Sequence, residues 1–60
     1  KQMIELFREK LKAEGRSLKW FWENRLPKDL RYIYFVQQLG NFKKLSDEVK
    51  EAIQIYLNEG

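Results

Sequence analysis

Apolar residues recur every three or four positions along this 60-residue chain, and this spacing constrains its fold more than any other feature. Near the N-terminus, Ile4, Phe7 and Leu11 fall on one side of a helix, with charged residues on the other sides. A second such stripe, near the C-terminus, consists of Val49, Ala52, Ile53, Tyr56 and Leu57. The spacing predicts an all-α fold, a small bundle of three to four short helices around one core.

Glycine, serine and proline residues predict where the first helices begin and end. Gly15 is placed to end a helix that starts near Met3, because glycine adopts the left-handed conformation without a side-chain clash. Ser17 is predicted to cap a second helix that runs to about Leu26. Pro27 fits the first turn of a third helix over residues 28–39. A single helix kinked at Pro27 is an open alternative.

The C-terminal third of the chain shows a similar division. Gly40 is predicted to end the third helix, and Phe42 to fill the core from the short connection that follows. Ser46 then starts a fourth helix, since its hydroxyl can cap the first turn and Asp47 and Glu48 suit the positive end of the helix dipole. Residues 32–36 have a strand-like composition, but no second strand is predicted to pair with them.

Length and composition limit the classes of protein to consider. Sixty residues are enough for one domain, 1–60, with a single core. The chain has no cysteine, so we expect neither a disulfide framework nor a thiolate metal site. No apolar run reaches the roughly 18 to 20 residues of a membrane span, and no signal peptide is visible, so we expect no membrane partner and an intracellular location.

The residues of the usual catalytic sites are missing. The chain has neither histidine nor cysteine, and its three glycines are too scattered for a phosphate-binding loop. Carboxylate pairs such as Glu5 with Glu9 have basic neighbours and are typical of a solvated helix face. We therefore expect a protein that is not an enzyme and that needs no cofactor or metal.

Three neighbouring aromatic residues, Trp20, Phe21 and Trp22, raise a question about packing. At about 100° per residue they cover some 200° of a helix, so they cannot all face one neighbour. The stripe of the second helix contains Leu18, Phe21, Trp22 and Leu26. This grouping predicts that Trp20 points away from the core, between Lys19 and Glu23.

The third and fourth helices also have apolar residues outside their stripes. The inward stripe of the third helix is predicted to contain Tyr32, Ile33, Phe35, Val36 and Leu39. Tyr34 and Leu30 fall outside it, and Ile55 is the corresponding outlier of the fourth helix. Exposed aromatic residues are frequent at binding surfaces. We expect a recognition patch from helices two and three that consists of Trp20, Tyr34, Arg16, Lys19, Arg31 and Leu30.

The charge is uneven along the chain. Residues 1–31 carry nine basic and five acidic residues, a net charge of +4, whereas residues 32–60 carry three and four, a net charge of −1. A protein or peptide partner, which an acidic segment would suit, is the main expectation. The alternative is a nucleic-acid-binding domain that uses the basic N-terminal half. Self-association through the outlying aromatic residues is a third possibility.

A scattered set of residues resembles the FF domain, a helical module for protein interaction. The set consists of Phe7, Leu11, Gly15, Trp22, Glu23, Leu26, Pro27, Asp29, Arg31, Tyr32, Tyr56 and Leu57. The resemblance implies that Phe7 and Trp22 belong to the core, that the protein is nuclear, and that it docks peptide segments, often acidic ones. The chain departs from the family pattern at Leu30, where the family has proline, and at Ile53, where it has phenylalanine.

Overall fold

Four helices account for most of the structure, a computed structural model that describes residues 2–40 and 45–59. They are Met3–Ala13 (α1), Leu18–Arg25 (α2), Tyr32–Gly40 (α3) and Asp47–Asn58 (α4). No strand occurs among the described residues. The prediction of a small all-α bundle is thus confirmed.

The predicted helix boundaries have visible local causes. Gly15, directly after α1, has a positive φ of 69°, a conformation that few other residues adopt readily. The Ser17 hydroxyl accepts a hydrogen bond from the Trp20 backbone N–H at 3.1 Å, and the Ser46 hydroxyl accepts one from Val49 at 3.4 Å. Both serines are the N-caps of their helices, as predicted. Gly40 is the last residue of α3.

The segment between α2 and α3 differs from the prediction. Residues 28–30 form a turn instead of the first turn of a helix, and the Leu30 N–H donates to the Pro27 carbonyl at 3.2 Å. The Leu30 carbonyl, which a helix starting at Lys28 would use, accepts a bond from the Trp22 indole at 2.6 Å. Leu26 is extended, as a residue before proline prefers. Helices α2 and α3 are therefore separate.

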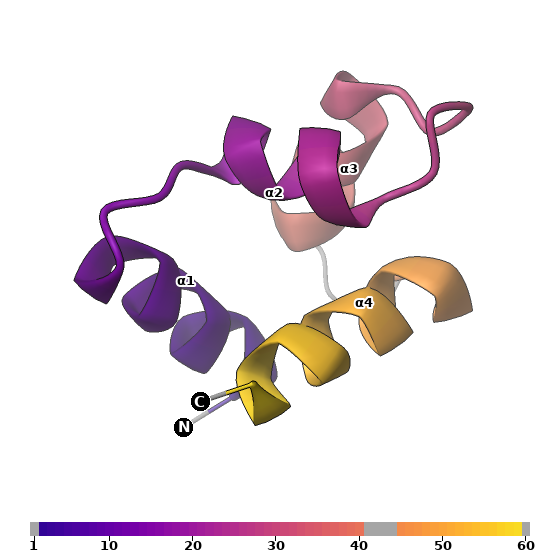
Figure 1. Ribbon diagram of the computed structural model, residues 1–60. Coiled ribbons are helices and arrows are strands. Elements are labelled where there is room, and N and C mark those ends of the chain that lie inside the picture. The colour runs from indigo at the N-terminus through magenta and orange to yellow at the C-terminus, as the bar shows by residue number, and fades with distance from the viewer. Residues whose placement is uncertain (1, 41–44, 60) are drawn as a thin grey trace.

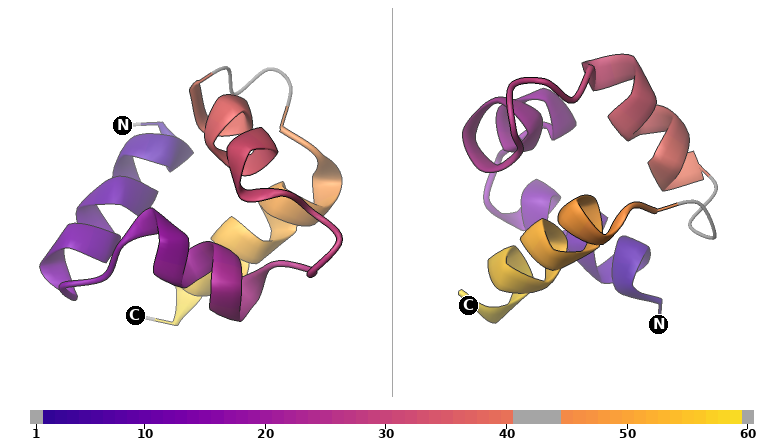
Figure 2. Two further views of the ribbon diagram at one scale, coloured as in Figure 1. Left: turned by 90° about the horizontal axis from the view of Figure 1, so that it is seen from above. Right: turned by 90° about the vertical axis from the view of Figure 1, so that its right-hand side faces the viewer.

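The helices pack as two pairs. Helix α1 contacts α4, and α2 contacts α3. Figures 1 and 2 show that the α2–α3 pair lies over the α1–α4 pair. The buried core between them consists of Ile4, Phe7, Leu11, Phe21, Leu26, Phe35, Leu39, Val49, Ile53 and Tyr56. All core residues of α1 and α4 belong to the predicted stripes, although Ala52 and Leu57, also predicted for the α4 stripe, are only partly buried.

Phe21 lies at the centre of this core, and its two neighbours serve different helices. The Phe21 ring is fully buried, and its centroid lies 4.7 Å from that of Phe7 in α1. Trp20 packs toward α4, with its ring centroid 6.0 Å from that of Tyr56. Trp22 packs toward α3, 5.5 Å from the ring of Tyr32. A helix between two neighbours can therefore use three adjacent rings.

This arrangement corrects the predicted orientation of Trp20. The residue is half-buried and packs against the core, instead of lying on the outer side with Lys19 and Glu23. The prediction assumed that one stripe of α2 was covered. In the structure α2 is covered on both flanks, so Trp20 and Trp22 are partly buried to similar degrees.

Helix α3 has a narrower buried stripe than predicted. Ile33 and Val36 were placed in the inward stripe, but they are 60% and 37% exposed. The reason is that α3 lies at the edge of the bundle and has α2 as its main neighbour. Leu30, predicted to lie outside the stripe, is half-buried. The predicted role of Phe42 in the core lies outside the described residues.

Candidate functional site

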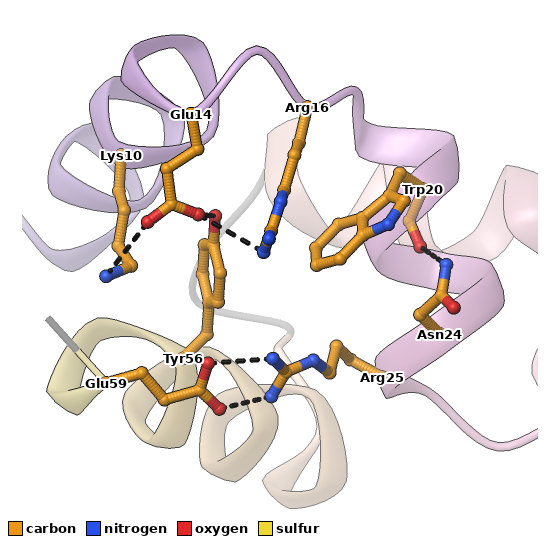
Figure 3. A network of polar contacts seen from close by, with 8 residues as sticks. All are labelled: Lys10, Glu14, Arg16, Trp20, Asn24, Arg25, Tyr56 and Glu59. Carbon is orange, nitrogen blue, oxygen red and sulfur yellow. Dashed lines mark hydrogen bonds and ion pairs between the residues drawn. The ribbon is translucent and has the colours of Figure 1, made fainter.

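A cluster of polar and aromatic side chains joins α1, α2 and α4 on one side of the bundle (Figure 3). We call it the polar cluster, and it consists of Lys10, Glu14, Arg16, Trp20, Asn24, Arg25, Tyr56 and Glu59. Four of its members, Arg16, Trp20, Asn24 and Arg25, come from α2 or the turn before it. It therefore contains part of the predicted recognition patch.

The phenol of Tyr56 connects α4 with the end of α1. Its ring is buried in the core, and its hydroxyl donates a hydrogen bond to Glu14 Oε1 at 2.5 Å. Glu14 also lies 3.3 Å from Lys10 Nζ and 3.2 Å from Arg16 Nη1. The hydrogen bond from Tyr56, and then the nearby cations, hold the pKa of Glu14 below its ordinary value. Burial, and then the bond to Glu14, raise the pKa of Tyr56.

Trp20 lies between cations that are already paired with acids. The Arg16 guanidinium lies 4.1 Å from the Trp20 ring centroid, which is the geometry of a cation–π contact. Arg25, at 5.9 Å from the same ring, donates two hydrogen bonds to the Glu59 carboxylate, one of them from Nη2 to Oε1 at 2.7 Å. These bonds lower the pKa of Glu59.

The polar cluster is built to hold three helices together. Its two carboxylates have lowered pKa values, so both are ionised near neutral pH and each faces at least one cation. A general acid or base that works near pH 7 needs a pKa close to that value, which neither carboxylate has. Arg16 and Trp20 thus have partners within the fold, although both keep some exposure to solvent.

The second candidate surface is the outer side of α3. We call the exposed side chains Ile33, Tyr34 and Val36 the α3 outer face; they are 60%, 52% and 37% exposed. Helix α3 contains no charged residue, and all 21 charged residues of the chain (12 basic and 9 acidic) lie outside its nine positions. This face is therefore uncharged, mainly apolar and open to solvent within the described structure, with the exposed amide of Gln37 beside it.

The members of the predicted patch fall on two surfaces. Arg16 and Trp20 belong to the polar cluster, whereas Tyr34 belongs to the α3 outer face, with Arg31 exposed just before α3 and Leu30 half-buried beside it. Lys19 is exposed at the start of α2. No hydrogen bond or ring contact joins Trp20 to Tyr34 among the described residues. The prediction of exposure is confirmed for Tyr34 and Ile55.

Helical spacing alone does not identify Ile33 and Val36 as surface residues. The signal that could have found them is the absence of charge from positions 32–40. An edge helix normally carries charged residues on its solvent side. Helix α3 has two glutamines instead, Gln37 and Gln38.

Comparison with known proteins assigns the chain to no family. The chain matches no protein-family model, no curated protein and no solved structure. Within residues 2–40 and 45–59, no helix combines the length and the apolar character needed to cross a membrane. The same residues contain no group of three or more acidic side chains close enough together to hold a metal ion.

Proposed function

We propose that this protein is a non-enzymatic interaction module and that the α3 outer face binds a segment of another protein. The observation that supports this most is the combination, in one nine-residue helix, of no charge and three exposed large side chains. Contiguous exposed apolar groups on a soluble domain commonly mark a site of interaction. The resemblance to the FF domain favours the same class of function.

The size of the α3 outer face sets the strength of binding to expect. Burying the exposed parts of Ile33, Tyr34 and Val36 would contribute about 6 to 7 kcal/mol, at roughly 25 cal/mol per Å². Association costs at least about 4 kcal/mol in lost freedom, so these three side chains cannot bind a partner tightly by themselves. We therefore expect a dissociation constant in the micromolar range or weaker, with further contacts from the rim of the face.

The charged residues at the rim of the α3 outer face, Lys28, Asp29 and Arg31, indicate the chemistry of the partner. Arg31 and Lys28 are exposed next to the N-terminal end of α3, and neither has an acidic partner among the described residues. Asp29 lies between them in sequence, which leaves a net charge of +1. A segment with apolar side chains for the face and a carboxylate for Arg31 complements this surface. Trp20 and Arg16, on the polar cluster, remain a predicted second contact.

A peptide selection tests the proposal without a known partner. Displayed 12-residue peptides are selected on the immobilised protein, and the binders are synthesised and titrated by NMR. We expect aromatic or branched apolar residues with nearby Asp or Glu, and at least tenfold weaker binding to Ile33→Glu, which adds a repelling charge to the face. Ile55→Glu is the matched control, because Ile55 is 52% exposed on another helix, and should bind these peptides normally.

The result that contradicts the proposal is a set of binders that Ile33→Glu and Ile55→Glu affect equally. A labelled single-stranded oligonucleotide of 20 nucleotides tests the alternative function in parallel. The nucleic-acid-binding function would be favoured instead if the oligonucleotide binds with an affinity that falls steeply as the salt concentration rises and that is unchanged in Ile33→Glu. Binding through the α3 outer face should depend little on salt, since apolar contacts carry most of it.

A further inference from the structure

A groove of about 370 Å³ lies between the end of α2 and one side of α4. Ala52 and Ile55 from α4 supply its apolar surface, and Ile55 is 52% exposed. The other lining residues are polar: Asn24 and Arg25 come from α2, and Glu48 and Glu51 come from α4. The groove is thus an apolar strip between charged walls, and it lies on different helices from the α3 outer face.

The lining residues of α4 form one continuous side of that helix. Residues three or four positions apart are neighbours on a helix surface. Glu48, Ala52, Ile55 and Glu59 follow one another at this spacing, and Glu51 lies beside them. A partner that lies along the groove therefore meets Ala52 and Ile55, with Glu48 and Glu51 toward the N-terminal end of α4.

The net charge of this side is negative. Among the described residues, Arg25 is the only cation that lines the groove, and Glu59 already binds it through two hydrogen bonds. Glu48 and Glu51 have no cationic partner among the described residues, so the groove keeps a charge of about −2 at neutral pH. Helix α4 as a whole has three acids and one lysine, a net charge of −2, in a chain whose net charge is +3.

We propose that this groove is a separate docking site for a basic segment of another protein. An apolar side chain of the segment packs on Ile55 and Ala52, and Lys or Arg residues next to it contact Glu48 and Glu51. An acidic peptide or a nucleic acid would be repelled by the same two carboxylates. The proposal does not rest on the α3 outer face, because the two surfaces share no residue and favour partners of opposite charge.

The test uses the Ile33→Glu variant as its starting protein, so that the α3 outer face does not dominate the selection. Displayed 12-residue peptides are selected on it at low salt and are then titrated as synthetic peptides. We expect peptides that combine Lys or Arg with a branched or aromatic residue. Adding Ile55→Lys should weaken their binding at least tenfold, and the NMR shifts of Asn24, Ala52 and Ile55 should move most during the titration.

Charge-reversal variants distinguish binding at this groove from general electrostatic attraction to the protein. Glu48→Lys with Glu51→Lys should also weaken binding at least tenfold. Glu5→Lys with Glu23→Lys changes the net charge equally, on exposed residues of α1 and α2, and should weaken it less than threefold. Glu48 lies in the first turn of α4, where its charge stabilises the helix, so its replacement can also weaken the fold. Circular dichroism must therefore show that each variant is folded. Ile55→Lys tests the site without changing that first turn.

Three outcomes would overturn the proposal. One is that no peptide is selected, and another is that both charge-reversal pairs weaken binding equally. The third is concentration-dependent self-association of the wild-type protein that Glu48→Lys with Glu51→Lys abolishes, because the occupant would then be the basic half of a second copy. The proposal is supported if the selected basic peptides bind weakly to Ile55→Lys and to Glu48→Lys with Glu51→Lys, but normally to Glu5→Lys with Glu23→Lys.

Discussion

Replacing Phe21 with alanine is expected to unfold most of the protein at 25 °C. The ring is fully buried and makes aromatic contacts with Phe7, Phe35 and Tyr56, which come from the three other helices. Truncation of a buried phenylalanine costs about 3 to 5 kcal/mol, from lost burial and the cavity that remains. A single core in a domain of this size rarely supplies more than about 3 to 5 kcal/mol in total.

Far-UV circular dichroism and urea unfolding measure this effect. The wild type should show one cooperative transition, and Phe21→Ala should show most of the unfolded signal without denaturant. Tyr34→Ala is the control, because it removes an aromatic ring that is 52% exposed and should leave the transition nearly unchanged. A loss below 1 kcal/mol for Phe21→Ala would show that the four helices do not converge on this ring.

The second large effect is expected at Trp20. Trp20→Ala should lower the free energy of unfolding by about 2 kcal/mol, less than the cost for a fully buried aromatic residue, because the side chain is only partly buried. The variant loses the ring contact with Tyr56 and the cation–π contact with Arg16. Trp22→Ala should cost a similar amount, since it removes the contact with Tyr32 and the hydrogen bond to Leu30.

Urea unfolding of the two alanine variants, with Trp20→Phe as a conservative control, distinguishes a packed Trp20 from an exposed one. Equal destabilisation by the two alanine variants, with a smaller loss for Trp20→Phe, is the expected pattern. A stable Trp20→Ala beside an unstable Trp22→Ala would instead mean that Trp20 lies free on the outer side of α2. Trp20 would then be available as the centre of a recognition patch.

Local chemistry explains which features of the fold could be predicted from the sequence. The caps at Ser17 and Ser46 and the left-handed Gly15 depend on a few neighbouring residues, so the sequence contains what is needed to predict them. The buried stripes of α1 and α4 are also predictable, because both helices show clear three-and-four spacing of apolar residues.

The features that could not be predicted depend on contacts between distant parts of the chain. Pro27 allowed a helix start at Lys28, but the bond from the Trp22 indole to the Leu30 carbonyl favours a turn there. Trp20 was predicted to be exposed because the sequence does not show that α2 has neighbours on both flanks. Tertiary packing of this kind overrides local patterns.

The candidate site was only partly predictable, because some of its features depend on one helix and others on how two helices pack. The exposure of Tyr34 follows from its place outside the stripe of α3, and the structure confirms it. That Trp20 and Tyr34 lie on separate surfaces depends on how α2 and α3 cross, which no spacing within one helix reveals. The groove beside Ile55 also needs two helices, α2 and α4, and so it has no signature in the sequence.

The central claim is that the fold does not use the α3 outer face, so that this face is free to bind a partner. Urea unfolding of the triple variant Ile33→Ala, Tyr34→Ala and Val36→Ala tests it most directly. The free energy of unfolding should stay within about 2 kcal/mol of the wild type, because the higher helix propensity of alanine partly offsets the lost partial contacts. A loss of 3 kcal/mol or more would mean that these side chains belong to the core, and would contradict the claim.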